Sequence, residues 1–229
     1  MTNEDLKAIE EAAKTAGKAI DVSEKLASFF KKVCGDAIVE AGGVLTDWAR
    51  FFRYKNLLLI HDKVNEIHQK RKVEGKTTPI PARYAIPLIQ KASTEDEESL
   101  QVMWAGLIAN ATDPNKRLEV KRIQIQILSE LEPLDAHVLE FFSKQGWLMI
   151  RGPHSKGFSL ERLSEELNVP REDLQISIEN LARLGCILAE RPVTYDDRHT
   201  SGVAVFFNNP NTTFRLSHLG SALLEACTV

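Results

Sequence analysis

The chain lacks the short motifs that would indicate an enzyme. The patterns GxxxxGKS/T, GxGxxG and GxSxG, which serve phosphate binding, dinucleotide binding and serine hydrolysis, do not occur in its 229 residues. Cysteine is scarce, because only Cys34, Cys186 and Cys227 are present, and no cysteine or histidine pair has the spacing of a zinc site. We therefore expect no catalytic residues, no cofactor and no metal, and we expect that the protein is not an enzyme.

An excess of one charge and a long apolar run are also missing. The net charge is −3, and residues 1–75, 76–150 and 151–229 carry +1, −2 and −2. No third of the chain is therefore a basic module that would attract nucleic acid or anionic lipid. No run of about 18 apolar residues occurs, as a membrane-spanning helix would need, and the acidic start Met1–Asp5 does not fit a secretory signal. We expect a cytoplasmic protein, with a peripheral position at the inner membrane as the alternative.

Residues 1–75 are typical of long helices, because they are rich in Ala, Glu, Lys and Leu and contain no proline. A stripe of mostly small side chains, spaced by three and four residues, runs from Leu6 to Ala41. It predicts helices that pack closely together, as in a hairpin. A further long helix is expected over residues 36–73, and Gly75 is expected to end it.

Aromatic and basic side chains gather in this part of the sequence. Such a mixture is typical of helices that lie at a membrane surface. We favour the other interpretation, which is an ordinary helical hairpin core whose charged side chains face solvent. The candidate interface or membrane face consists of Phe29, Phe30, Trp48, Phe51 and Phe52.

Proline and polar residues predict the boundaries of the next two helices. Residues 77–81 contain two prolines and predict an extended linker. A short helix is expected over residues 83–91, with Pro87 in its first turn because an interior proline removes a backbone hydrogen bond. Thr94 and Glu97 have the spacing of a capping box, which predicts that the following helix begins at this point.

Three helices are expected between this point and residue 146. The first includes Leu100, Trp104 and Leu107 and is apolar nearly all round, so we expect it to lie centrally. The other two are predicted over residues 116–130 and 133–145.

The pattern changes after Gly146, where shorter helices alternate with strands. The expected order is a helix capped by Ser159, a second helix that ends at Gly185, two strands at 187–189 and 203–207 that pair with each other, a short strand at 214–216 and a last helix at 217–226. This is the order of a winged helix-turn-helix, with the polar loop 194–202 as the wing. The sequence therefore predicts a mainly α protein with a helical hairpin or bundle over residues 1–145 and a winged helix over residues 146–229.

A winged helix raises the question of DNA binding, which its second helix would perform in the major groove. The candidate nucleic-acid or partner contacts are Arg171, Gln175, Asn180, Arg183 and, in the wing, Arg198. Glu172, Asp173 and Glu179 share the second helix and would repel phosphate. We therefore favour packing or protein contact for this module, with DNA binding as the alternative.

Two histidines, His61 and His68, are candidate metal ligands because they lie on one expected helix. They are seven residues apart, whereas a helical metal pair such as HExxH is spaced by three or four. No cysteine or carboxylate cluster accompanies them. We expect solvated or partly buried histidines rather than ligands.

Several short segments in the middle of the chain are similar to the sequences of a known protein family. They are Pro81-Ala82-Arg83 with Pro87, Ala92–Glu98, Met103–Ala111 and Leu128–Ala136. Through them the segment from Gly43 to Leu139 resembles the abortive-infection alpha (Abi-alpha) family of bacterial phage-resistance proteins, and the predicted winged helix lies outside this segment. The resemblance implies defence against phage, in which the infected cell is sacrificed or halted, and it implies no catalytic residues.

The combined expectation is a non-enzymatic anti-phage defence protein. It would act through protein contacts or assembly, with a protein partner or self-association, and action at a membrane is a variant of this hypothesis. The alternative is a winged-helix transcriptional regulator that binds DNA.

Overall fold

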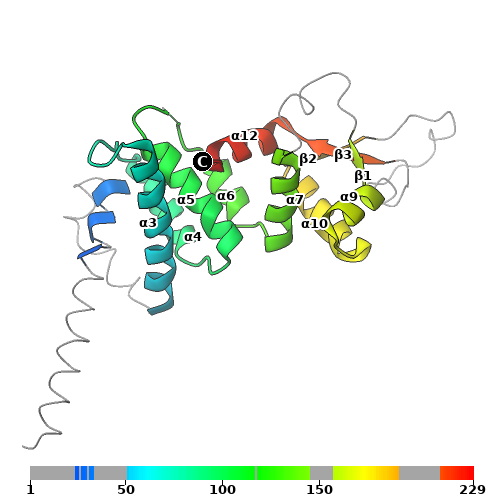
Figure 1. Cartoon of the computed structure of the whole chain (residues 1–229), viewed down its shortest axis with the longest axis horizontal. Coiled ribbons are helices and arrows are strands. Elements are labelled where there is room, and N and C mark those ends of the chain that lie inside the picture. Colours follow the sequence, from blue (N-terminus) through cyan, green and yellow to red (C-terminus); the bar gives the residue numbers. More distant parts are fainter. Residues whose placement is uncertain are drawn as a thin grey trace, which may run out of the picture. The chain divides into compact units, whose positions relative to one another are not determined.

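The computed structural model describes residues 24–25, 27–29, 31–33, 51–116, 118–144, 157–190 and 212–229. Helices dominate these residues, and a small three-stranded antiparallel sheet lies in the C-terminal part (Figure 1), so the predicted fold class is confirmed. Two units can be distinguished. The first comprises the described residues up to Asp96 with Trp104–Ile125 and Val229, and the second comprises Glu97–Met103 with the described residues from Gln126 to Thr228.

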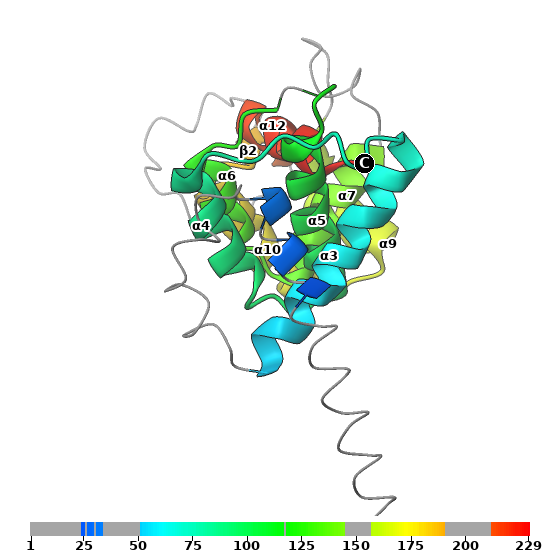
Figure 2. The same cartoon turned by 90° about the vertical axis from the view of Figure 1, so that its left-hand side faces the viewer.

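The first unit is helical, and its main elements face the viewer in Figure 2. They are α3 (Phe51–Arg71), α4 (Ala82–Ala92), most of α5 (Glu98–Thr112) and the start of α6 (Arg122–Leu128). Trp104, Leu107 and Ile108 of α5 are at most 1% exposed, which confirms the prediction of a central apolar helix. The helix α3 ends at Arg71, and the following Lys72 and Gly75 both have left-handed backbone angles.

Two local predictions for this unit are wrong. The helix α4 begins at Ala82, so Pro87 lies in the interior of the helix and not in its first turn. Thr94 does not cap α5, which begins only at Glu98, and its hydroxyl instead donates to the Lys91 carbonyl oxygen at 2.8 Å. A threonine hydroxyl satisfies a carbonyl at the end of one helix as readily as an amide at the start of the next.

The second unit contains a helix-turn-helix and the sheet. Its helices are α7 (Pro133–Lys144), α9 (Leu160–Leu167), α10 (Arg171–Arg183) and α12 (His218–Cys227), and its strands are β1 (Phe158–Ser159), β2 (Ile187–Glu190) and β3 (Thr213–Leu216). Ser159 caps α9 as predicted, and Gly185, with a φ of +72°, follows α10. The helix α7 packs against α10 and groups with the second unit. The domain boundary that the sequence placed at residue 145 stays a prediction.

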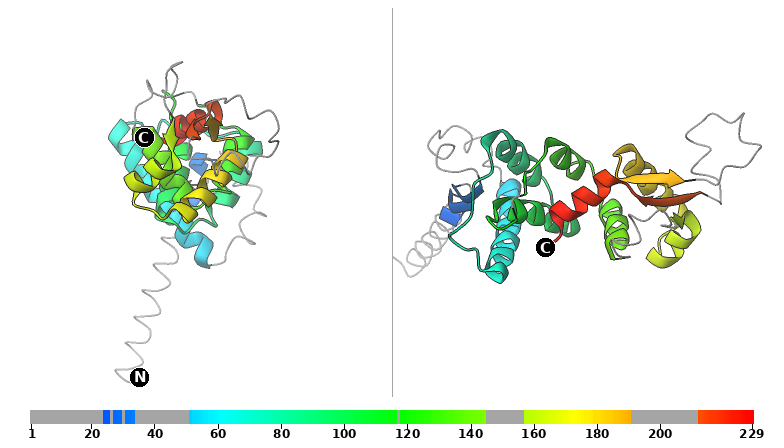
Figure 3. Two further views of the ribbon diagram at one scale, coloured as in Figure 1. Left: turned by 90° about the vertical axis from the view of Figure 1, so that its right-hand side faces the viewer. Right: turned by 90° about the horizontal axis from the view of Figure 1, so that it is seen from above.

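The sheet has the strand order β1-β3-β2, with β3 in the centre. Its register pairs Phe158 with Phe214 and Ile187 with Leu216. The right-hand view of Figure 3 shows β2 beside β3, and α12 continues directly from β3. The sequence paired residues 187–189 with 203–207; the latter lie outside the described residues, and the described partner of β2 is β3.

The start of α12 lies directly against the start of β2. The Ser217 amide donates to the Cys186 carbonyl oxygen at 2.9 Å, and the Ser217 hydroxyl accepts from the Gly220 amide at 2.9 Å. A Cβ atom on Gly220 would lie 2.1 Å from the same Cys186 oxygen. The absence of a side chain at Gly220 therefore permits this close approach of helix and strand.

Candidate functional site

A groove lies between α10 and the chain that enters α7. It has a volume of about 560 Å³ and is lined by residues within Glu130–Asp135 and by one face of α10. Asp173, Ile176, Ser177 and Asn180 form that face, because residues three and four apart project from the same side of a helix. We call it the α7–α10 groove.

A buried carboxylate joins the two walls of this groove. Asp135 is only 1% exposed. Its Oδ1 accepts a hydrogen bond from the Ser177 hydroxyl at 2.6 Å, and its Oδ2 accepts one from the Asn180 amide at 2.6 Å and one from the Glu132 backbone amide at 2.8 Å. Three donors thus compensate the burial of one carboxyl group, which holds α10 against α7.

The predicted contact residues on α10 are already engaged with their own chain. The Asn180 side-chain amide also donates to the Glu130 carbonyl oxygen at 3.2 Å. Arg183 forms an ion pair with Glu130 at 2.8 Å, and it donates to the Asn180 side-chain oxygen at 2.7 Å. A base-reading role would require these groups to point freely at DNA, so the structure opposes that role for Asn180 most strongly.

Two other predicted contacts, Arg171 and Gln175, lie on the outer surface of the second unit. Arg171 forms an exposed ion pair with Glu161 at 3.3 Å, and the Gln175 amide donates to Glu179 at 2.9 Å. Exposed pairs of this kind are weak and exchange readily. Arg198 lies outside the described residues.

The rim of the groove is acidic, and its most prominent side chain is apolar. Four of the nine lining residues are acidic and one is basic. Ile176 is 70% exposed, more than any other large hydrophobic side chain among the described residues. A single exposed apolar side chain is ordinary on a protein surface, but Ile176 lies in a groove with Leu134, and apolar side chains within a polar rim are typical of protein-contact surfaces. Of the groove lining, only Asn180 and Arg183 were predicted as contacts. The sequence signal for Ile176 was an isoleucine on the polar side of the helix.

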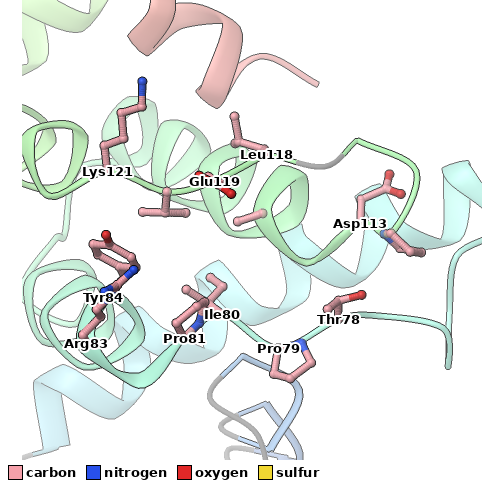
Figure 4. Close-up of a pocket in the computed structure, with 13 residues that line it drawn as sticks. Thr78, Pro79, Ile80, Pro81, Arg83, Tyr84, Asp113, Leu118, Glu119 and Lys121 are labelled. Atoms are coloured by element: carbon pink, nitrogen blue, oxygen red, sulfur yellow. The ribbon is translucent and has the colours of Figure 1, made fainter.

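A second cavity, of about 670 Å³, lies entirely in the first unit (Figure 4). One wall is the linker before α4, where the Thr78 amide donates to the Thr112 carbonyl oxygen at 2.9 Å. Arg83, Tyr84 and Lys121 lie at one end of the cavity, and the guanidinium of Arg83 lies 4.7 Å from the centre of the Tyr84 ring. The residues around Pro81, which carry part of the family resemblance, therefore form one wall of this cavity.

The charges of this cavity do not select a ligand of one sign. Two cations, Arg83 and Lys121, face two acidic residues, Asp113 and Glu119. Asp113 is buried and pairs with Arg71 at 3.4 Å. A cavity with balanced, mostly exposed charges gives an anion or a cation little preference over water.

A buried polar cluster lies where α3, α5 and residues 24–33 meet. His68 is fully buried, so the expectation of a solvated or partly buried side chain is wrong for it, and its Nε2 lies 3.3 Å from the Ala109 carbonyl oxygen and 3.1 Å from the Thr112 hydroxyl. The ring of Phe29 is fully buried and meets the His61 ring edge-on, with 5.2 Å between centroids.

The burial of Phe29 opposes the less favoured interpretation, in which its ring lies on an interface or membrane face. A ring with no accessible surface contributes to a core and not to a membrane contact. The positions Phe30 and Trp48, and the side chains of Phe51 and Phe52, lie outside the described residues. For these four residues the predicted face stays a prediction.

The surroundings of His68 disfavour its charged form. Burial is the largest effect and lowers the pKa of His68 from the ordinary value of 6.5. The hydrogen bond to the Ala109 carbonyl and the charge of Asp113 act to raise the pKa, whereas Lys32 and Arg71 act to lower it. The net effect is a lowered pKa of His68, because desolvation penalises the charged form of the ring.

A pH dependence of stability follows from this shift. The unfolded chain binds a proton at His68 more readily than the folded chain does, so the free energy of unfolding falls as the pH drops below about 6.5. In urea titrations at about pH 7 and about pH 5, we expect the wild-type midpoint to fall more than that of His68→Gln, which can still donate to Ala109. Equal losses in the two proteins would show that His68 is not the group responsible.

The described residues show little capacity for metal or thiol chemistry. Within these ranges, no three His, Cys, Asp or Glu side chains are placed to hold a metal ion. Burial and the nearby Asp135 raise the pKa of the Cys186 thiol to about 12, which disfavours its reactive thiolate form. In the part of the chain that the structure describes, no helix combines the length and apolar character needed to cross a membrane.

Comparison with known proteins places this architecture in a family. The family model described as abortive infection alpha matches residues 54–227. No curated protein and no solved structure matched the chain. The expectation that the C-terminal part lies outside the family segment is therefore wrong, since the match includes α10 and the whole sheet. Because the match covers both cavities and most of the sequence, the chain belongs to the abortive infection alpha family, and this membership supports a role in abortive-infection defence.

Proposed function

We propose that this chain is a non-enzymatic defence protein that acts by contacting another protein through the α7–α10 groove. The observation that carries the proposal is the exposure of Ile176, at 70%, on a helix face with an acidic rim. An apolar side chain in a groove with a fixed polar wall offers a partner both an anchor and a defined shape. The Asp135 hydrogen bonds supply that fixed wall.

The fold supports a winged helix that is used for protein contact. The order α7, β1, α9, α10, β2, β3 is that of a winged helix-turn-helix, with α10 as its second, recognition helix. In a winged helix that binds DNA, this helix would present basic and amide side chains to bases and phosphates. Here Glu172 and Asp173 are exposed in its first turn, and Arg183 is paired with Glu130. The acidic surface favours a protein partner over the phosphate backbone.

Replacement of Ile176 by aspartate tests this proposal. Because the side chain is mostly exposed, the fold should tolerate the change, while a partner would have to bury a new charge. We expect Ile176→Asp to bind its partner at least about tenfold more weakly, which corresponds to about 1.4 kcal/mol, and therefore to lose protection in a plaque assay at low phage dose. The matched control is Ile123→Asp, at a 42% exposed isoleucine that does not line the groove, and this variant should protect as wild type does.

Two outcomes would contradict the proposal. Full protection by Ile176→Asp would show that the groove is not the contact surface. Binding to duplex DNA that weakens steeply with salt, and that Arg171→Glu reduces while Ile176→Asp does not, would favour the transcriptional regulator. Protection at low dose but not at high dose is the pattern expected of abortive infection.

A further inference from the structure

We propose that the α7–α10 groove binds the Trp48–Lys55 segment of a second copy of this chain. This inference rests on the proposed protein-contact function and names the partner. It would make the chain a self-assembling protein in which one surface of each copy meets a different surface of the next.

The groove presents unpaired negative charge around an apolar centre. Glu132 and Asp173 are exposed, and no ion pair between described residues involves either of them. Leu134 and Ile176 supply the apolar lining between the two helices. A matching segment therefore needs large apolar side chains with arginine or lysine beside them.

The chain itself contains such a segment. Residues 48–55 read Trp-Ala-Arg-Phe-Phe-Arg-Tyr-Lys, which combines four aromatic side chains with three cations. No acidic residue occurs between Asp47 and Asp62. Aromatic residues and arginine are the residue types most enriched at the centres of protein interfaces. The complementarity between the groove and this segment is one of residue types alone, since the side chains before Lys55 lie outside the described residues.

The asymmetry of this contact predicts the form of the assembly. The groove and the segment are different parts of the chain, so each copy can bind one neighbour through its groove and another through its segment. Contacts of this head-to-tail kind close into rings or continue as open filaments, in contrast to a symmetric dimer. The Asp135 hydrogen bonds fix the groove before binding, which reduces the ordering cost of each contact.

Charge exchange between the two surfaces tests the proposal on the full-length protein. By sedimentation velocity, the wild type should self-associate, and the association should weaken as salt is raised, because exposed charges are screened. The variant Arg50→Glu/Arg53→Glu and the variant Glu132→Lys/Asp173→Lys should each bind themselves at least about tenfold more weakly. A mixture of the two variants should form assemblies larger than a pair, because the reversed segment of one meets the reversed groove of the other in addition to the native groove–segment contact.

Several results would overturn this inference. The first is a wild type that stays monomeric at about 100 µM, a concentration at which even weak contacts are detected. The second is a mixture of the two variants that fails to associate although urea midpoints show that both variants are folded. A third is binding of wild type, but not of Arg50→Glu/Arg53→Glu, to vesicles of phosphatidylglycerol and phosphatidylcholine without any self-association. That result would assign the segment to a membrane surface.

The outcome for Ile176→Asp separates this inference from the proposed function. A monomeric wild type whose protection is lost in Ile176→Asp would leave the groove as a contact for a different protein. Self-association that depends on both surfaces, combined with full protection by Ile176→Asp, would instead remove the defence role of the groove.

Discussion

Replacing Asp135 with alanine is expected to lower the free energy of unfolding by about 3 to 5 kcal/mol, because it leaves buried donors without an acceptor. The Ser177 hydroxyl and the Asn180 amide both lie 2.6 Å from this carboxyl group, and Asp135 is 1% exposed. Removal of the carboxylate also frees the backbone amide of Glu132. Urea unfolding followed by circular dichroism measures the loss.

The matched control for this prediction is Asp173→Ala, which removes an exposed carboxylate from the same groove. Its effect should stay within about 0.5 kcal/mol, as is usual for surface changes. The double variant Asp135→Ala/Ser177→Ala should lose less than the sum of the two single losses, because the two side chains share one hydrogen bond. Additive losses would show that the Asp135–Ser177 bond does not contribute to stability.

Gly220→Ala is the second change with a large expected effect, at about 3 kcal/mol or more, because overpacking against a rigid backbone cannot be relieved by a side-chain rotation. The added Cβ atom would lie 2.1 Å from the Cys186 carbonyl oxygen and 2.9 Å from its carbon. The helix α12 or the start of β2 must therefore move. A lower urea midpoint, with loss of protection of the β2 and β3 amides in hydrogen exchange, is the expected result.

Two further variants separate the cause of this effect. Glu225→Ala lies on an exposed position of α12 and should leave the midpoint nearly unchanged, since a helix tolerates alanine well. Cys186→Ala should not rescue Gly220→Ala, because the clash is with the backbone and not with the thiol. A wild-type midpoint for Gly220→Ala would mean that the helix and the strand are less closely packed than described.

The fold class could be predicted because the signals that set it are local. Helical periodicity, the Ser159 cap and the glycine after α10 act over a few residues and were confirmed. The boundary between α4 and α5 could not be predicted, because Thr94 can serve either helix and only the packed structure selects the Lys91 carbonyl. The strand β1 contains two residues, too few to show any alternation.

The candidate site depends on contacts that no short window of sequence contains. Asp135 meets Ser177 and Asn180 at sequence separations of 42 and 45 residues. The α10 residues were chosen for their chemical type, and the type of Asn180 fits base reading as well as it fits a buried hydrogen bond. Only the tertiary structure shows that this amide serves the second purpose, which moves attention from Asn180 to the exposed Ile176.

The shared carboxylate of Asp135 also has a consequence for how this family can diverge. A change at Ser177 or Asn180 alone removes a partner from a buried charge, whereas a change at Asp135 alone leaves three donors without this acceptor. Drift at any one of the three positions is therefore tolerated only when the others change with it. Across descendants of a common ancestor, Asp135, Ser177 and Asn180 would be inherited as one unit, while the exposed acids of the rim remain free to follow the surface of whatever they bind.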